Sequence, residues 1–404
     1  MTNSQLPHLS ETHALPPLSP PPPPQDAWER KHAAATTRRG RARRSFGRRW
    51  KLFAGLGIVV TFYVAAAFAM FIAPYDASEQ SRQEPFMPPT PIHFRDAQGQ
   101  WHARPFIYKL RLTDPLARIY GEDTSARYPL ALFTRGGSYK LFGLFPTDRH
   151  LFGVADDARQ NSEPPVGRNA PPQRVYLLGT DDFGRDRLSR LLVASRFSLV
   201  VGPLGTLLAG ALGIALGCVS GYAGRKVDAL LMRTADAMLA LPVLVLILAV
   251  RAAFPLVLLP AQAGGLLVLI FVAIGWAEIA RLARGLVLGL REREFVMAAV
   301  SLGLTETRIL FRHILPNAAR PLIVQLSLML PAFLLAETAL SYLGVGVPEP
   351  GASWGNMLRE AGNSTLLAGQ PFVLLSPAFA IFLFVLGVRL LSDGLRGDAD
   401  IRAR

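Results

Sequence analysis

A run of about twenty uncharged residues, Leu52–Ala73, constrains this chain more than any other feature. At roughly 1.5 Å per residue, a helix of this length crosses a hydrocarbon layer of roughly 30 Å. The composition agrees, because 50% of the 404 residues are hydrophobic and only 18% are charged, whereas soluble domains carry about 25% charged residues. The sequence therefore predicts an integral membrane protein.

Five more apolar segments predict further spans, and the charges between them predict an orientation. These spans cover residues 197–220, 237–259, 264–288, 321–343 and 371–391. Residues 1–51 carry ten Lys and Arg against three Asp and Glu, and such basic flanks stay on the cytoplasmic side. We expect an all-α membrane protein with six transmembrane helices and both termini in the cytoplasm. A cleaved signal peptide is the alternative for the first span, but the basic region is too long for one.

The segments outside the spans differ in character. Residues 1–51, rich in Pro and Arg, are predicted to be a disordered basic cytoplasmic tail. Residues 74–178 lack a long apolar run and predict a small β-containing extracytoplasmic insertion, with turns at Ala97–Gln100 and Arg135–Ser138 and a linker over 156–172. The first helix then covers residues 52–73, the main transmembrane domain 179–393, and a cytoplasmic C-terminal tail 394–404.

Two features of the second span bear on its packing. Four arginines lie just before or at its start, on the outer side, which opposes the positive-inside pattern; attachment to a long translocated loop accounts for them. They are Arg185, Arg187, Arg190 and Arg196. Small residues allow helices to approach closely in a membrane, and the span contains Gly202, Gly205, Gly210, Gly213, Gly217 and Gly221.

The loop between the fourth and fifth spans, residues 292–317, predicts two short helices. Gly303 permits the left-handed conformation that ends the first helix, and Thr305 is placed to cap the second. Pro316 is expected to limit the second helix. The pair is expected to form a compact apolar and basic knob, and from physics alone an interfacial helix pair lying on the membrane is the alternative.

This loop resembles the cytoplasmic coupling motif of binding-protein-dependent ABC importer permeases, in which Glu-Ala-Ala, three residues and Gly precede a spacer that ends in Leu-Pro. Ala298, Ala299, Gly303, Leu315 and Pro316 match in register, while Met297 replaces the Glu. The resemblance implies that the loop docks on an ATPase subunit. The coupling residues it implies are Glu294, Met297, Ala298, Ala299, Gly303, Arg312, Leu315 and Pro316.

Other segments look like the dipeptide, oligopeptide and nickel permease family, in its second-permease branch, and occur in family order. They are Leu178–Arg190, Arg196–Leu199, Gly221–Asp228, Leu340–Gly346 and Ser353–Met357. The resemblance implies the type I ABC importer permease fold in a bacterial inner membrane. Its implied partners are a homologous permease subunit, two ABC ATPase subunits and a periplasmic substrate-binding protein.

Charged residues near the spans carry three further expectations. Arg233 and Asp236, and likewise Glu278 and Arg281, have the three-residue spacing of an ion pair on one helix face, and a contact with the coupling loop is the alternative. Glu337 lies well inside the fifth span, where a carboxylate normally faces a cavity or a partner. We expect it to line the translocation path or to contact the partner permease.

No catalytic chemistry is predicted. No Walker Gly-x-x-x-x-Gly-Lys-Ser/Thr sequence occurs, so ATP and Mg²⁺ are expected on the partner subunits, with no cofactor on this chain. His93 and His102 lack carboxylates at metal-ligand spacing. The single cysteine, Cys218, excludes an intrachain disulfide, and the localised basic charge argues against nucleic-acid binding. Two alternatives remain: a stand-alone channel or secondary transporter, and a membrane-anchored receptor or enzyme that uses the 74–178 lobe.

Overall fold

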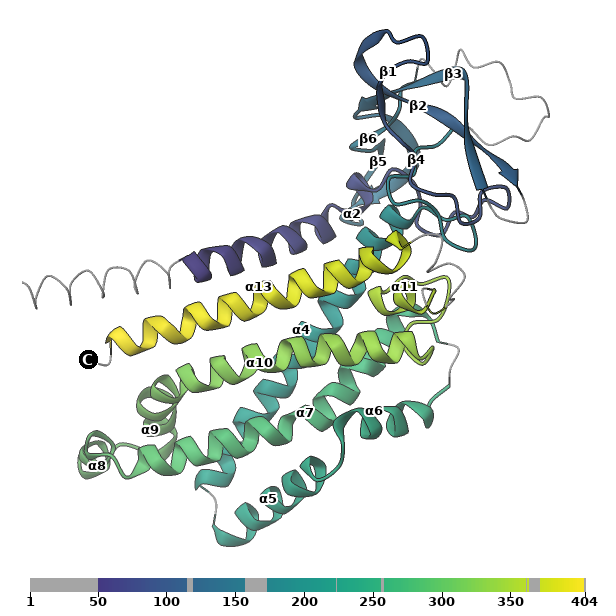
Figure 1. The fold of residues 1–404 in the computed structure, drawn as a ribbon. Helices are drawn as coiled ribbons and strands as arrows, with labels where there is room; N and C mark the ends of the chain where they lie inside the picture. Colours follow the sequence, from purple (N-terminus) through teal and green to yellow (C-terminus); the bar gives the residue numbers. More distant parts are fainter. Residues whose placement is uncertain are drawn as a thin grey trace, which may run out of the picture. The chain divides into compact units, whose positions relative to one another are not determined.

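The structure is a computed structural model that describes residues 50–114, 119–156, 173–222, 224–255, 258–360, 362 and 371–402. The predicted tail 1–51 lies outside these residues except at its last two positions, as does most of the predicted linker. The described part combines a bundle of long helices with a β-lobe of six strands, β1 to β6 (Figure 1).

Long apolar helices build the bundle. They are the first helix Trp50–Ala67, α4 Arg187–Tyr222, α7 Pro260–Arg291, α10 Leu315–Tyr342 and α13 Phe372–Arg402. Shorter helices connect them: α2 Ala69–Ile72, α5 Arg225–Leu239, α6 Val243–Ala252, α8 Glu294–Ser301, α9 Glu306–Ile309, the π-turn η1 Leu310–Ile314 and α11 Trp354–Glu360. Within the described residues, five helices are long and apolar enough to cross a membrane, or six if the bent pair α5 and α6 counts as one span, which confirms the predicted fold class.

The third span is not the straight helix predicted over 237–259. The helices α5 and α6 meet at a 91° bend. Pro242 occupies the N-cap position of α6, where its missing N–H and its restriction of the preceding residue end one helix and start another. A proline at this point therefore breaks the span that the apolar run alone suggested.

Glycines on α4 bring it against α7, as the sequence predicts. A Cβ added to Gly213 would lie 2.6 Å from the carbonyl oxygen of Trp276, and one added to Gly217 would lie 2.6 Å from the Cβ of Ala283. Contacts this short exclude any side chain. The backbones of α4 and α7 thus touch directly, which is the close packing that small residues permit in membranes.

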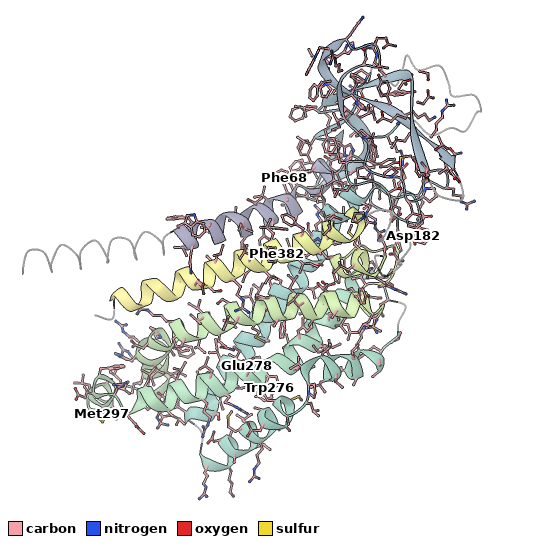
Figure 2. All side chains as sticks on the ribbon, in the orientation of Figure 1. Phe68, Asp182, Trp276, Glu278, Met297 and Phe382 are labelled. Atoms are coloured by element: carbon pink, nitrogen blue, oxygen red, sulfur yellow. The ribbon has the colours of Figure 1, made fainter. Side chains whose placement is uncertain are left out.

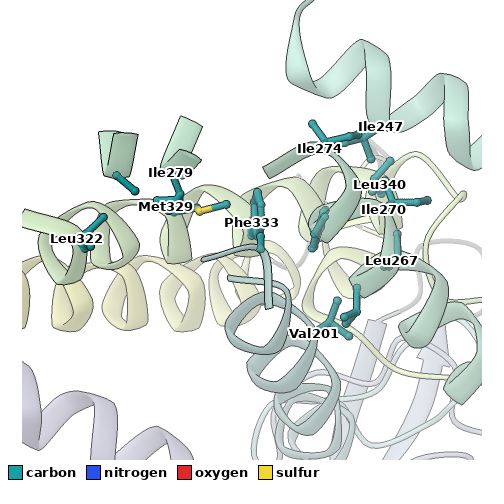
Figure 3. Close-up of a cluster of buried hydrophobic side chains, with 14 of the residues drawn as sticks. Val201, Ile247, Leu267, Ile270, Ile274, Ile279, Leu322, Met329, Phe333 and Leu340 are labelled. Carbon is teal, nitrogen blue, oxygen red and sulfur yellow. The ribbon is translucent and has the colours of Figure 1, made fainter. Parts of the chain in front are cut away.

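The largest buried cluster lies where α4, α7 and α10 meet. Figure 3 shows Phe333 of α10 beside Met329, with Val201 and Leu267 contributed by the neighbouring helices. Phe333 stacks on Phe271 with ring centroids 4.5 Å apart. Aromatic stacking of this kind adds about 1 kcal/mol beyond simple burial, so this contact strengthens the packing of α10 on α7.

The β-lobe confirms the predicted β-rich insertion. Its strands are β1 His93–Arg95, β2 Trp101–Asp114, β3 Ile119–Leu132, β4 Arg135–Leu141, β5 Phe145–Arg149 and β6 Phe152–Val154. A four-stranded antiparallel sheet has the order β1-β2-β3-β6, and β4 pairs with β5 as a separate hairpin.

One of the two predicted turns is correct. The turn between β1 and β2 contains Gly99 at φ +86°. The turn predicted at Arg135–Ser138 is wrong, because those residues lie inside β4. A Cβ on Gly136 would lie 2.5 Å from the His150 ring, so this glycine provides room for a side chain and the chain reverses later, at Phe142 and Gly143.

Candidate coupling site and charged networks

The predicted hinge of the coupling loop is present in detail. Gly303 has φ +74°, its N–H donates to the Val300 carbonyl at 2.9 Å, and the Leu304 N–H donates to the Ala299 carbonyl at 3.2 Å. These two bonds form a Schellman motif, in which a left-handed residue closes a helix end. Leu304 also packs in the same apolar cluster as Ala299, so Gly303 ends α8 and directs the chain into α9.

The second predicted helix differs from expectation at both ends. Thr305 occupies the N-cap position of α9, but its hydroxyl makes no capping bond and lies 3.4 Å from the Thr307 hydroxyl. Pro316 does not limit the helix, because α9 and η1 continue into α10. Pro316 lies in the first turn of the α-helical segment, where its missing N–H is tolerated, and the preceding π-turn carries the Leu315 N–H to the Leu310 carbonyl.

The coupling loop presents a divided surface. Val296, Ala299, Ile309 and Ile314 are buried together with Cys218 at the end of α4. The opposite side exposes large apolar side chains, and Leu302 is 81% exposed. Met297, labelled in Figure 2 at the far end of the bundle, is also exposed. Of the predicted coupling residues, Ala299 belongs to this buried cluster and Leu315 packs against it.

The remaining predicted coupling residues lie near the surface of the loop. Glu294, Ala298, Gly303, Arg312 and Pro316 are exposed, and Leu315 is half-buried. An exposed apolar patch beside basic groups is typical of a docking surface. Within the described residues, the outward side of α8 is therefore exposed, while its inward side packs against α4 and α7.

Ion pairs between helices brace the bundle next to the loop. Asp228 of α5 accepts two bonds from Arg284 of α7, at 2.5 and 2.6 Å, and Asp236 pairs with Arg281. Glu278 accepts from Gln325 of α10 at 2.6 Å. The predicted intrahelical pairs Arg233–Asp236 and Glu278–Arg281 are therefore wrong, because packing α5 and α10 on α7 offers partners that helix spacing does not reveal.

Glu337 lies fully buried between α4, α10 and α11. Its carboxylate accepts hydrogen bonds from Ser198 at 3.0 Å and from Ser341 at 2.8 Å. The Ser198 hydroxyl in turn accepts from the Trp354 backbone N–H at 3.4 Å. The carboxylate thus has polar partners within this chain, and the expected contact with a path or a partner permease stays a prediction.

A buried arginine network, which the sequence did not predict, joins the start of α4 to the segment around α11. Arg185 donates to Asp181 at 2.6 Å and to Glu349 at 2.7 Å. Arg190 donates to Glu349 at 3.2 Å and to Glu360 at 3.5 Å. These guanidinium groups are buried, and carboxylates from the opposite segment balance their charge.

Two other arginines of the same run also have specific partners. Arg187 donates to Glu360 at 3.1 Å. Arg196 donates to the Ala66 and Ala67 carbonyls at 2.9 and 3.2 Å, at the end of the first helix, where cations stabilise free carbonyl groups. The four arginines that opposed the positive-inside pattern are therefore structural. The presence of four arginines on the outer side, against the positive-inside pattern, was the one sequence feature that could have indicated the network.

The carboxylates of this network also bear on metal binding. Ligand oxygens of Asp181, Asp182 and Glu360 lie within 4.8 Å of one another. However, Arg185 lies 3.9 Å from Asp182 and 3.8 Å from Glu360. The guanidinium therefore already supplies positive charge to these carboxylates, and we assign no metal to them.

Asp186 caps α4 from a buried position. Its Oδ2 accepts from the Ser189 N–H at 2.9 Å and from the Ser189 hydroxyl at 2.5 Å. Burial raises the pKa of Asp186 to about 6, although the bonds from Ser189 oppose the shift. The carboxylate is thus held where its charged form is poorly solvated.

The histidines of the β-lobe have carboxylate partners that their sequence spacing concealed. His93 lies 2.9 Å from Glu122 and His102 lies 2.8 Å from Asp96. Arg127 also donates to Asp96, at 2.7 Å. Antiparallel pairing of β1, β2 and β3 brings these residues together, so each contact is consistent with a cross-strand polar pair that stabilises the sheet.

Comparisons with known proteins identify the family to which this chain belongs. Residues 213–397 match the family described as the binding-protein-dependent transport system inner membrane component, and residues 37–89 match the N-terminal TM domain of oligopeptide transport permease C. The oligopeptide transport system permease protein OppC of Bacillus subtilis is 36% identical over 239 residues, which cover 59% of this chain and 76% of OppC. The chain belongs to the family of binding-protein-dependent transport permeases.

A second relative gives the same family. The dipeptide transport system permease protein DppC of Alkalihalophilus pseudofirmus is 39% identical over 236 residues, 58% of this chain and 75% of DppC. Among solved structures, the inward-facing MetNI methionine ABC transporter is similar with a TM-score of 0.37 and 18% identity, over 51% of this chain and 90% of that chain. Because this structural likeness is weak, the family assignment depends on the sequence relatives.

Membership in this permease family assigns the chain a class of function. It is a multi-pass inner-membrane permease of a binding-protein-dependent ABC system, and the family has no catalytic activity of its own. The family is therefore neither that of a stand-alone channel or secondary transporter nor that of a membrane-anchored receptor or enzyme. The relatives also match the second-permease branch that the sequence motifs indicated.

Proposed function

We propose that this permease imports peptides that a periplasmic binding protein delivers. The relatives named above are oligopeptide and dipeptide permeases, and this supports a peptide cargo. The observation that carries the mechanism is the coupling loop, whose α8 is fixed inward through Ala299 and exposes Leu302 outward.

Partner ATPase subunits would dock on the outward side of α8. Glu294, Met297, Ala298 and Arg312 are exposed there or nearby, and Gly303 sets the angle between α8 and α9. Leu315 and Pro316 join the loop to α10, so displacement of the loop is transmitted to that helix. Two ATPase subunits and a homologous permease subunit complete the importer, and ATP with Mg²⁺ binds to the ATPase subunits.

The orientation follows the charges. We propose that the basic residues before Trp50, the coupling loop and the C-terminal end lie in the cytoplasm, because Lys and Arg favour that side. The β-lobe would then lie outside the cytoplasm, on the side from which the binding protein delivers substrate. Switching between outward-open and inward-open states would move the peptide across without chemistry on this chain.

For Glu337 we propose a positioning role. Its bonds to Ser198 and Ser341 connect α4 with α10, and Ser198 also accepts from the first residue of α11. A Cβ on Gly355 would lie 2.6 Å from the Ser341 Cβ, so α11 packs tightly at the same place. Glu337 would therefore hold α11 against the spans, and any effect on the path would act through α11.

The Leu302→Asp variant tests the docking proposal. A charge on this exposed apolar residue should abolish co-purification of the ATPase subunits and ATP-coupled uptake of labelled dipeptides and oligopeptides, while the permease still inserts. Trp101→Asp, at an exposed apolar residue of the β-lobe, is the control and should retain both. Normal ATPase capture by Leu302→Asp would refute the docking site, and uptake of some other solute in place of peptides would refute the cargo.

A further inference from the structure

The β4–β5 hairpin of the β-lobe runs along the segment that follows the first helix. At one end, His150 donates from Nδ1 to the Ala73 carbonyl at 2.6 Å. At the other end, the Phe142 ring packs edge-on against Phe68, with centroids 5.2 Å apart. The hairpin tip therefore lies beside Phe68, directly after the first helix, while its base lies beside Ala73.

The residues at this tip are large, apolar and exposed. Phe142 is 50% exposed and Leu144 is 75% exposed, and the ring of Phe145 is also open to the surroundings. Leu132 and Phe133, next to β4, are exposed as well. Isolated apolar residues are common on protein surfaces, but a contiguous group of this size marks a surface that something apolar covers.

Backbone conformation singles out two of these aromatic residues. Phe142 has φ +53° and Phe133 has φ +57°, a region that bulky side chains rarely adopt. Both rings contact the segment at the end of the first helix, because Phe133 lies 6.1 Å from Phe71 and Phe142 contacts Phe68. Both strained residues thus direct an aromatic side chain toward the same place.

The first helix fixes where this place lies relative to the membrane. The described part of the first helix, Trp50–Ala67, has 18 residues, and α2 continues it to Ile72. The apolar run Leu52–Ala73 is long enough to cross a hydrocarbon layer about 30 Å thick, so its last residues, from Phe68 to Ala73, lie near the far boundary of that layer. Tyr63, Val64 and Phe68 are exposed on the first helix and just after it. The apolar tip continues this exposed helical surface, whichever side of the membrane the lobe occupies.

We propose that the tip of the β4–β5 hairpin, Leu141–Phe145, inserts into the headgroup region of the bilayer beside the first helix. Arg135, Lys140 and Arg149 are exposed on the same hairpin, where they are placed to contact lipid phosphates. Tyr139, half-buried, donates to the Arg149 carbonyl at 2.7 Å, and tyrosine is enriched at this depth of the membrane. The occupant of the surface is phospholipid, and the lobe is held to the membrane at two points, the first helix and the hairpin.

Spin labels on the full chain, reconstituted with its co-purifying subunits in phosphatidylcholine and phosphatidylglycerol nanodiscs, test this inference. The only native cysteine is replaced by Cys218→Ala, and a nitroxide is attached in the Leu144→Cys variant. The control is Trp101→Cys, which replaces a residue with the same 75% exposure. Trp101 pairs with Arg95 of β1, and β1 lies at the end of the lobe away from α2 (Figure 1). Collision with oxygen reports lipid, and collision with a soluble nickel complex reports water.

The Leu144 label should collide more often with oxygen than with the nickel complex, and the Trp101 label should show the reverse. Adding Phe142→Ser and Phe145→Ser to Leu144→Cys should shift its label toward the nickel complex, because the apolar tip would no longer enter the lipid. Equal nickel access at both positions would overturn the proposal. Protection of the Leu144 label from both reagents would also overturn it, since a protein partner would then cover the tip.

Discussion

Arg284 of α7 and Asp228 of α5 form a two-bond ion pair, with Nε to Oδ1 at 2.5 Å and Nη2 to Oδ2 at 2.6 Å. The Ser220 hydroxyl of α4 also donates to Oδ1 of Asp228. Three helices therefore meet at one carboxylate. Arg291, one residue before the coupling loop, donates to the Gly221 carbonyl at 2.7 Å, so the end of α7 is also bonded directly to α4.

A double-mutant cycle of Asp228→Ala and Arg284→Ala measures the coupling energy of this ion pair. Both side chains are about one quarter to one third exposed, at 23% and 32%, so we expect a coupling energy of about 1 kcal/mol in denaturant unfolding of the detergent-solubilised protein. The more exposed pair Asp236–Arg281 is the control and should show weaker coupling. Equal coupling for the two pairs would contradict the prediction.

Gly303→Ala should weaken coupling through the backbone alone. The position has φ +74° and a Cβ there would have no neighbour within 4 Å, so the expected cost is the roughly 1 kcal/mol of a left-handed non-glycine residue. Gly303→Asn should retain more ATP-coupled uptake, because Asn tolerates this conformation. Gly285→Ala, also without neighbours within 4 Å but inside helix α7, should be neutral or stabilising. Uptake equal to wild type in Gly303→Ala would show that the hinge is dispensable.

Glu337→Ala should loosen α11. The change leaves a cavity and removes the acceptor for the Ser198 and Ser341 hydroxyls, at a cost of about 2 kcal/mol or more. Hydrogen exchange of the Trp354–Glu360 amides should accelerate in Glu337→Ala and change less in Glu337→Gln, which keeps one oxygen. Glu278→Ala, at an exposed carboxylate, is the control. Unchanged exchange in α11 together with lost uptake would instead favour a direct role in the path.

Asp186 predicts a pH dependence of stability. Its pKa in the folded state is raised from 3.8 to about 6, so the folded protein binds this proton more tightly than the unfolded chain. Stability from this group is therefore fully present below pH 3.8 and is lost as the pH rises through about 6. Asp186→Asn is neutral at every pH, so its Tm minus that of wild type should increase between these pH values and then level off. A constant difference would show that Asp186 does not titrate in this way.

Cysteine labelling tests the proposed orientation. In a Cys218→Ala background, a membrane-impermeant maleimide should label Trp101→Cys in intact spheroplasts. Leu302→Cys should react only after the membrane is permeabilised, although Leu302 is 81% exposed. The reverse pattern would mean that the chain lies in the membrane with its termini outside the cytoplasm.

Patterns that depend on near neighbours in the sequence predicted much of this fold. The apolar runs identified the spanning helices, Gly303 identified the loop hinge, and the glycines of α4 identified its packing on α7, because each property follows from local composition. The prediction that Pro316 limits the second helix was wrong for a local reason too. A proline in the first turn after a π-turn leaves the helix intact.

These local patterns could not predict contacts between segments that are far apart in the sequence. Arg190 and Glu349 are 159 residues apart, and Asp228 and Arg284 are 56 residues apart, so no spacing rule connects them. The hydroxyls that bind Glu337 come from two helices, α4 and α10, and their convergence depends on packing angles that composition does not determine. The arginines before α4 are the exception, because their place on the outer side opposes the positive-inside pattern and so indicates that they have buried partners.

The close contact between α4 and α7 restricts which amino acids are tolerated at the facing positions of these two helices. A Cβ added to Gly217 would lie 2.6 Å from the Ala283 Cβ and 3.0 Å from the Arg284 backbone nitrogen, so a larger residue at 217 would require both helices to separate. Separation would also open the contact four residues earlier, at Gly213. Substitutions at these facing positions are therefore accepted jointly or not at all, and Ala283 is expected to vary in evolution only together with Gly217.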